Sequence, residues 1–107
     1  MKRAKAYMRM STDKQEHSIE SQWRLIKEFA DRNGYTIVGK YEDEGISGRA
    51  AEKRPAFMQM IDDSDSGDFD TVLIYDSSRF ARNLKDAIVY KSILKQNGVD
   101  LISITEP

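Results

Sequence analysis

The chain has 107 residues, of which 39% are hydrophobic and 33% are charged, and these proportions are typical of one folded globular domain rather than a disordered chain. Its 17 basic and 18 acidic residues leave a formal net charge of −1, so it lacks the basic excess that is usual in nucleic-acid binders. The absence of cysteine excludes disulfides and thiolate zinc sites, and the longest aliphatic or aromatic run, "VLIY", is too short to span a membrane.

The first half of the chain alternates between strand and helix patterns. The residues "RAKAYMR" (3–9) predict a strand, and segment 18–34 predicts a helix with a serine N-cap, an apolar stripe and an Asn-Gly stop. The residues "YTIVGKY" (35–41) predict a second strand. The next segment, "EDEGISGRAAEKR" (42–54), has no clear period, and a loop of this length in a compact domain is more often functional than idle.

The second half continues the alternation. A proline opens a predicted helix over 55–64, and the apolar run "DTVLIY" (70–75) predicts a strand that is buried on both faces. A polar loop over 76–82 leads to a predicted helix over 84–96, for which an asparagine and an aspartate form a capping pair. The residues "VDLISI" (99–104) predict the last strand.

The predicted order β-α-β-α-β-α-β is typical of a three-layer α/β/α fold, with a mainly parallel sheet of four to five strands and right-handed crossovers. In such sheets, ligands bind beyond the carboxyl ends of the strands. Segments 9–15, 43–54 and 76–82 all follow strands, so we expect all three at that edge. The sequence shows no internal repeat and no linker, which predicts a single domain over residues 1–107.

Four arginines and one serine stand on these segments: Arg9, Ser11, Arg54, Arg79 and Arg82. A guanidinium is always protonated, and its planar fork of donors fits phosphate oxygens. A serine hydroxyl is a weak nucleophile unless its proton is taken up or the developing charge is stabilised. Taken singly, each residue is more common as a loop serine or a surface arginine. Together they indicate phosphoryl transfer with serine as the nucleophile, because that chemistry depends mainly on positioning and charge neutralisation.

Three separated motifs resemble one known family. The stretch "YMRMSTDKQ" (7–15) resembles the Tyr-x-Arg-x-Ser-Thr-x-x-Gln signature that opens the catalytic domain of the serine recombinases, which include resolvases, invertases and large serine integrases. The stretch "DEGISGRAAEKRPAF" (43–57) resembles the family's Gly-x-Ser-Gly loop ending in Arg-Pro, and "DTVLIYDSSRFARN" (70–83) resembles its strand and loop ending in Arg-x-x-Arg. With "GVDLISITEP" (98–107) similar to a late strand, the resemblance covers nearly the whole chain.

The resemblance implies that Ser11 attacks a DNA phosphate, leaving a 5′-phosphoseryl linkage and a free 3′-hydroxyl. The residues that would surround the scissile phosphate are Arg9, Arg54, Arg79 and Arg82, and those that would support the site by hydrogen bonding are Gln15 and Gln22. One phosphodiester is exchanged for another at nearly equal energy, so neither ATP nor a metal cofactor is implied. The long loop before Pro55 is typical of the large integrase or transposase branch.

The chain departs from the family pattern in one residue. Family members usually carry Asp directly before the first arginine of Arg-x-x-Arg, whereas this chain has Ser78 there, and its nearest acid is Asp76. Either the acid is dispensable, or Asp76 takes its part from a shifted position.

The second departure is length. The family's catalytic domain is followed by a long dimerisation helix and DNA-binding domains, and the sequence stops at Pro107, before such parts. We therefore expect a fragment that is a monomer or weak dimer and cannot recombine DNA alone. The full-length protein is expected to bind double-stranded DNA and self-associate as a dimer or tetramer. We also expect it in the cytoplasm, because the first residues contain no apolar signal segment, and without a membrane partner.

Two other functions fit parts of the pattern. A phospho-receiver domain has its phosphate-accepting aspartate just after a buried third strand. In that interpretation, Asp76 would be phosphorylated with Mg²⁺ nearby. Such a domain needs an acidic pair after its first strand, where this chain reads "MRMST". A non-catalytic DNA-binding or interaction module is the other alternative, if Ser78 marks a degenerate site. His17, the only histidine, has no cysteine or second histidine with which to bind a metal and is expected to face solvent near a helix start.

Overall fold

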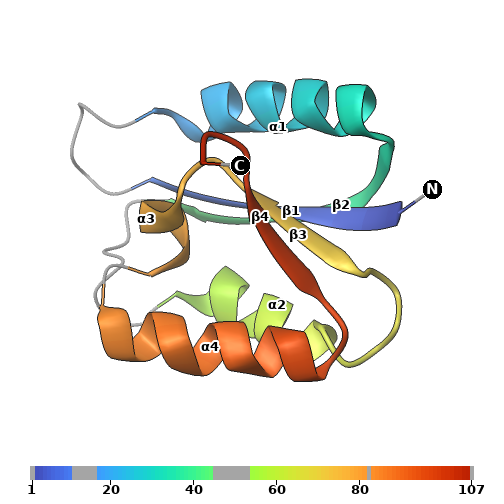
Figure 1. Ribbon diagram of the computed structural model, residues 1–107. Helices are drawn as coiled ribbons and strands as arrows, with labels where there is room; N and C mark the ends of the chain where they lie inside the picture. The colour runs from blue at the N-terminus through green and yellow to red at the C-terminus, as the bar shows by residue number, and fades with distance from the viewer. Residues whose placement is uncertain (1, 11–16, 45–53, 82, 107) are drawn as a thin grey trace.

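The computed structural model of the chain describes residues 2–10, 17–44, 54–81 and 83–106. Strands and helices alternate along the chain, as the sequence predicts, except that two helices stand between the third and fourth strands (Figure 1). The elements are β1 (Lys2–Met10), α1 (Ile19–Asn33), β2 (Tyr35–Glu44), α2 (Pro55–Asp63), β3 (Thr71–Ile74), α3 (Ser77–Phe80), α4 (Leu84–Gln96) and β4 (Asp100–Ser103). No helix in these described ranges is long and apolar enough to cross a membrane.

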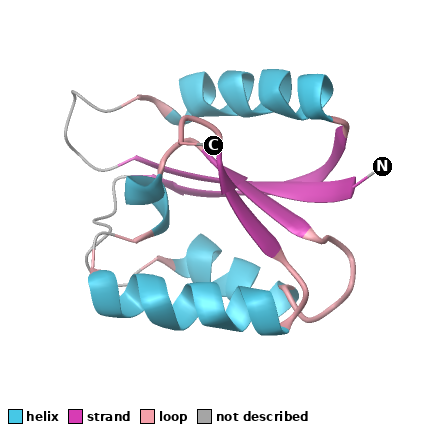
Figure 2. Cartoon of the chain, in the orientation of Figure 1, coloured by secondary structure: helices cyan, strands magenta, loops and turns pink. Residues whose placement is uncertain are grey.

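The described strands form one four-stranded sheet in the order β2-β1-β3-β4, and every neighbouring pair is parallel. Helix α1 covers one face of this sheet, while α2 and α4 cover the other, so the domain has three layers (Figure 2). The predicted α/β/α fold is therefore confirmed. Because all strands run in the same direction, their carboxyl ends meet at one edge, where the predicted site segments begin.

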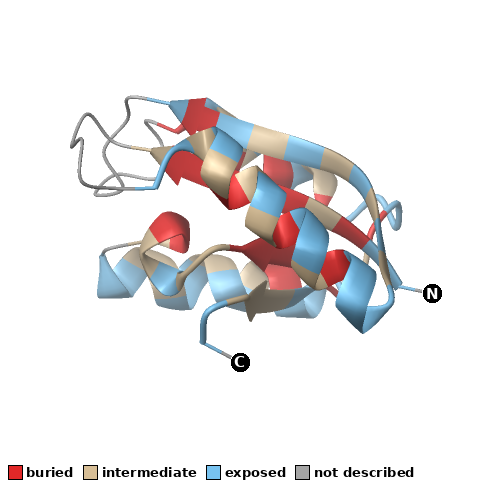
Figure 3. Ribbon diagram, turned by 90° about the horizontal axis from the view of Figure 1, so that it is seen from above, coloured by how far each residue is buried: buried red, intermediate tan, exposed pale blue. Residues whose placement is uncertain are grey.

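The core is divided by the sheet into two clusters, and β1 contributes to both. Successive side chains of a strand point to opposite faces, so Ala4, Ala6 and Met8 pack toward α1. Tyr7 lies on the other face, in the cluster formed with residues of α2 and α4. Arg9 shares that face by the same alternation, which directs it toward the helices α2 and α3. The buried residues of the sheet concentrate on β1 and β3, and Figure 3 also shows buried positions on the helices.

Capping residues in the sequence predicted the helix ends correctly. The Ser18 side chain accepts a hydrogen bond from the Ser21 N–H at the start of α1, and Gly34 ends that helix in the left-handed conformation at φ 77°. The Asn83 side chain accepts hydrogen bonds from the N–H groups of Lys85 and Asp86 at the start of α4. These caps depend on residues close in sequence, and for that reason the sequence predicts them.

Two elements differ from the prediction. Strand β2 continues beyond residue 41 to Glu44, because its parallel pairing with β1 extends to the Met10–Glu44 pair and places Asp43 opposite Arg9. The predicted loop over 76–82 contains a four-residue helix, α3, whose N-cap Asp76 accepts a hydrogen bond from the Ser78 N–H. Both differences lie at the carboxyl edge of the sheet and shape the candidate site.

Candidate active site at the carboxyl edge of the sheet

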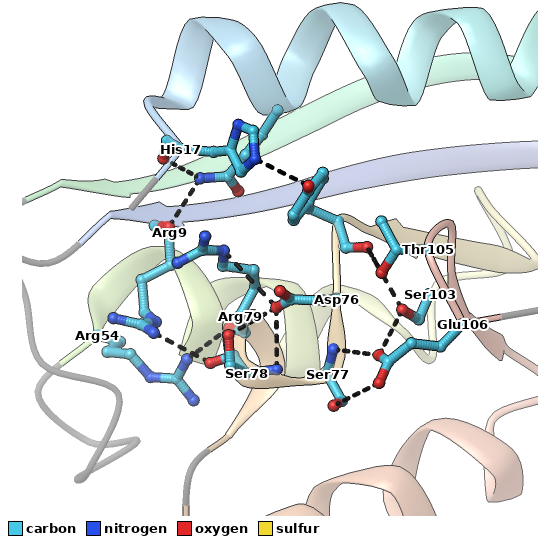
Figure 4. A network of polar contacts seen from close by, with 12 residues as sticks. Arg9, His17, Arg54, Asp76, Ser77, Ser78, Arg79, Ser103, Thr105 and Glu106 are labelled. Carbon is cyan, nitrogen blue, oxygen red and sulfur yellow. Dashed lines mark hydrogen bonds and ion pairs between the residues drawn. The ribbon is translucent and has the colours of Figure 1, made fainter. Parts of the chain in front are cut away.

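Six of the nine residues proposed for the site are described by the structure, and they come from β1, α1, the start of α2 and the α3 region: Arg9, Gln22, Arg54, Asp76, Ser78 and Arg79. The other three, Ser11, Gln15 and Arg82, lie outside the described residues. Figure 4 shows the arginines and Asp76 around α3. The structure therefore brings together, at the predicted edge, all of the arginines in the set that it describes.

Helix α3 is held by arginines at its carbonyl end. A helix this short leaves most of its carbonyl groups without partners inside the helix. The Arg9 Nη2 atom donates a hydrogen bond to the Ser78 carbonyl oxygen over 3.0 Å. Arg54 donates from Nη1 to the Arg79 carbonyl oxygen over 3.1 Å and from Nη2 to the Phe80 carbonyl oxygen. Two arginines thus bind three consecutive carbonyl groups of α3.

These arginine side chains lie inside the domain. Arg9 and Arg54 have no exposed surface, and Arg79 is 4% exposed. Burying a guanidinium is unfavourable unless hydrogen bonds replace its contacts with water, and the α3 carbonyl groups supply such bonds. The Arg54 guanidinium also lies 4.0 Å from the centre of the Phe57 ring, a cation–π contact. Arg54 therefore supports the α3 backbone, a role that the sequence does not predict for it.

Asp43, at the end of β2, connects Arg54 to the sheet through Tyr7. The Tyr7 hydroxyl donates to Asp43 Oδ2 over 2.8 Å and accepts a hydrogen bond from Arg54 Nη1 over 3.3 Å. Burial raises the pKa of Tyr7 well above its ordinary value; Arg54 opposes this rise, and Asp43 adds to it. The tyrosine therefore stays protonated and serves as a donor to the carboxylate.

Asp43 also caps α2. Its carboxylate accepts the N–H groups of Ala56, over 3.1 Å, and Phe57, over 3.0 Å. Arg54 occupies the N-cap position and makes no side-chain capping bond, so the carboxylate of another element takes that role. Sequence reasoning missed Asp43. The sequence held one signal for it. An arginine, a poor capping residue, stands directly before the proline that opens the helix, so the first N–H groups of the helix need an acceptor from elsewhere in the chain.

We expect Asp43→Ala to lower the free energy of unfolding by about 2–4 kcal/mol, because it leaves the Tyr7 hydroxyl and two helix N–H groups without their acceptor. The exposed carboxylate of Asp62, also on α2, offers a matched control, and Asp62→Ala should change stability by less than about 0.5 kcal/mol. Urea unfolding of both variants measures the difference. Equal stability of the two variants would contradict the capping role of Asp43.

Asp76 lies beside both Ser78 and Arg79. Its Oδ1 atom accepts hydrogen bonds from the Ser78 N–H over 3.1 Å and from the Ser78 hydroxyl over 2.6 Å. The Arg79 Nε atom lies 3.8 Å from the same oxygen, within ion-pair distance. One carboxylate oxygen thus contacts the serine that stands at the unusual position and the first arginine of the Arg-x-x-Arg motif.

Gln22 joins α1 to the end of β1. Its buried amide Nε2 donates to the Arg9 carbonyl oxygen over 3.0 Å and to the His17 carbonyl oxygen over 2.9 Å. These two residues stand on either side of the segment that contains Ser11. His17 is exposed just before α1, as predicted, and its Nε2 lies 2.9 Å from the Tyr75 hydroxyl. Within the described ranges, no cluster of His, Asp or Glu could hold a metal ion.

Comparison with known proteins places this chain in a family. Residues 4–107 match the family model described as "Resolvase, N terminal domain". The chain is 34% identical over 101 residues to a protein of Bacillus subtilis (strain 168) named "Putative DNA recombinase", covering 92% of this chain and 19% of that protein. It therefore spans about a fifth of the length of this relative.

Two solved structures share the fold closely. The N-terminal catalytic domain of TP901-1 integrase superimposes with a TM-score of 0.90 at 34% identity, covering 98% of this chain and 78% of that chain. A resolvase family site-specific recombinase from Streptococcus pneumoniae gives a TM-score of 0.84 at 39% identity, covering 99% of this chain and 74% of that one.

The fold is that of a serine recombinase catalytic domain. The chain belongs to the resolvase family, in which it matches the N-terminal domain. The family resemblance expected from the three sequence motifs is thereby confirmed. This assignment also decides against the phospho-receiver interpretation of Asp76.

Proposed function

We propose that this chain is the catalytic domain of a site-specific DNA recombinase of the integrase or transposase type, and that Ser11 is its nucleophile. The Ser11 oxygen forms a bond to a DNA phosphorus while the bond from phosphorus to the 3′-oxygen breaks. The serine loses its proton, and the departing 3′-oxygen gains one. The 5′-phosphoserine that results is later attacked by a 3′-hydroxyl, which reverses these steps and rejoins the strands.

Arg9, Arg54 and Arg79 converge near the end of β1, where Arg9 stands two residues before Ser11, and this convergence carries the proposal. Negative charge accumulates on the phosphate oxygens as the serine attacks. Cationic groups already fixed in a site with little water stabilise such charge more than mobile groups in solvent. The burial of these arginines supports a site that is organised before the substrate arrives.

The arginines have different parts in this proposal. Arg9 and Arg79 neutralise the scissile phosphate, joined by Arg82 on the family pattern. Arg54 contributes positive charge to the site and holds α3 by binding the carbonyl groups of Arg79 and Phe80. Gln22 fixes the end of β1 next to the nucleophile segment, and the family pattern gives Gln15 a similar supporting role.

Asp76 and Ser78 together replace the aspartate that the family usually carries before the first arginine. The contact between the Asp76 carboxylate and Ser78 hydroxyl, over 2.6 Å, supports this proposal, as does the position of Arg79 beside the same oxygen. The acid would thus act from a position two residues earlier in the chain. It orients the arginine through a carboxylate, as an aspartate at position 78 would.

The substrate of the complete protein would be double-stranded DNA, and recombination requires that several copies of the protein act together, as a dimer that pairs into a tetramer. Residues 1–107 would supply the catalytic part of each copy and would not recombine DNA alone. Long dimerisation and DNA-reading segments would come from elsewhere in the complete chain. Its place of action would be the cytoplasm.

A covalent intermediate tests the proposal directly. The complete protein is incubated with duplex DNA from the ends of the mobile element that carries its gene. The mixture is then denatured and analysed for a DNA–protein adduct. Peptide mass spectrometry should place the DNA phosphate on Ser11, and the released strand should carry a free 3′-hydroxyl. Specific DNA binding without any adduct would instead favour a non-catalytic binding module.

A further inference from the structure

The segment that follows β4 contacts the start of α3 through the carboxylate of Glu106. The Ser77 N–H donates to Glu106 Oε1 over 2.8 Å, and the Ser77 hydroxyl lies 3.4 Å from Oε2. The Ser103 hydroxyl donates to Oε1 over 2.8 Å, which orients the carboxylate from its own side (Figure 4). Glu106 is thus held between the end of one strand and the first residue of the helix that carries Arg79.

The backbone strengthens this connection. The Thr105 N–H, over 3.2 Å, and the Thr105 hydroxyl, over 2.9 Å, both donate to the Tyr75 carbonyl oxygen. The Ile104 N–H donates to the Ile74 carbonyl oxygen over 2.9 Å. Ile104 and Thr105 are therefore bonded to the end of β3 and to the residue that follows it, and these bonds hold Glu106 next to α3.

Helix α3 depends on such contacts for its existence. Four residues cannot form a stable helix in water, because nucleation is unfavourable and few internal bonds repay it. Carboxylates bind its first N–H groups, Glu106 at Ser77 and Asp76 at Ser78, while Arg9 and Arg54 bind its carbonyl groups. The position of α3 is therefore set by side chains from other parts of the chain. Glu106 contributes the contact from β4.

We propose that Glu106 is a positioning residue for DNA cleavage, acting through α3 on the guanidinium of Arg79. This inference rests on the proposed recombinase function. By binding the Ser77 N–H, the carboxylate fixes the first turn of α3, and Arg79 lies two residues further along that turn. Loss of the contact lets the turn rotate, so that Arg79 loses its alignment with Asp76 and with the phosphate.

The ionisation of Glu106 agrees with this geometry. The hydrogen bond from the Ser77 backbone, together with those from the Ser103 and Ser77 hydroxyls, lowers the pKa of the Glu106 carboxyl below its usual value. A lowered pKa means that the contact is fully present above the ordinary pKa of 4.5 and is lost as the pH falls through the folded-state value. The carboxylate is therefore charged and able to accept these bonds at neutral pH.

The test compares two carboxylates of the β4 region in the complete protein. Glu106→Ala removes the contact with α3, and Glu106→Gln retains one oxygen acceptor of the same reach. Asp100→Ala is the matched control, because Asp100 is an exposed carboxylate at the opposite end of β4. Hydrogen exchange of the peptide over 75–81 reports the contact, and the rate of adduct formation on saturating DNA from the element ends reports its effect on cleavage.

We expect Glu106→Ala to accelerate exchange at α3 and to slow adduct formation by up to about 100-fold, the cost of a 1 Å misplacement of a catalytic group, with DNA affinity unchanged. Glu106→Gln should recover part of the rate, and Asp100→Ala should behave as wild type. Unchanged exchange, or faster exchange with a wild-type cleavage rate, would overturn the positioning role of Glu106. A wild-type protein that forms no adduct would instead overturn the recombinase function, and this inference with it.

Discussion

Replacing Ser11 by alanine is expected to abolish covalent attachment of the complete protein to DNA while leaving DNA binding intact. The alanine side chain has no oxygen with which to attack phosphorus, and removal of a nucleophile cannot be compensated by the charge around the phosphate. A comparable removal of a serine nucleophile from a protease lowers turnover by about 10⁶. The adduct should therefore fall below detection on a denaturing gel with end-labelled DNA.

The neighbouring hydroxyl provides the control for Ser11. Thr12→Ala removes a hydroxyl from the next residue, so a general disturbance of this segment would lower the adduct in both variants. We expect the adduct to persist in Thr12→Ala and DNA binding to persist in both. An adduct that survives in Ser11→Ala would show that another residue is the nucleophile and would refute the assignment.

Replacing Arg54 by alanine is expected to cause the largest loss of stability of any single arginine change in the described site. The fully buried guanidinium bonds to the Tyr7 hydroxyl and to the carbonyl oxygens of Arg79 and Phe80. Alanine leaves these acceptors unpaired inside the domain and opens a cavity beside Phe57. Together, these effects should lower the free energy of unfolding by about 3–5 kcal/mol.

Thermal unfolding of the Arg54→Ala variant measures this loss. For a domain of about 100 residues, each 1 kcal/mol shifts the midpoint by roughly 4–8 °C, so a decrease of more than about 12 °C is expected. Arg24→Ala, on the exposed side of α1, removes the same side chain where it contacts solvent and should shift the midpoint only slightly. Arg54→Lys should fall between them, because an ammonium group cannot reproduce the planar fork.

The same substitution should also lower adduct formation, since α3 carries Arg79 and loses two of its carbonyl contacts. Cleavage is therefore compared at a low temperature at which both proteins are folded. A variant that is as stable as wild type but inactive would show that Arg54 contacts the phosphate instead of supporting α3. This outcome would support the direct phosphate contact that the family pattern predicts for Arg54.

The sequence by itself determined the order of all elements except α3, the parallel sheet and the resemblance to the family. These features depend on local information: apolar periodicity distinguishes strands from helices, and capping residues such as Ser18 and Asn83 mark helix ends within a few residues. The three motifs likewise identify the family from short contiguous stretches. The edge at which Arg9 and Arg79 meet followed from topology, because parallel strands present their carboxyl ends together.

Only the tertiary structure decided what each polar side chain at that edge contacts. Asp43 reaches Tyr7 across 36 residues of sequence, Arg54 reaches Phe80 across 26, and Glu106 reaches Ser77 across 29. No local pattern predicts these partners, and α3 was missed because its stability comes from them and not from its own four residues. Hydrogen-bond partners and burial are set where strand ends from distant parts of the chain come together, which is a property of the folded domain and not of any segment within it.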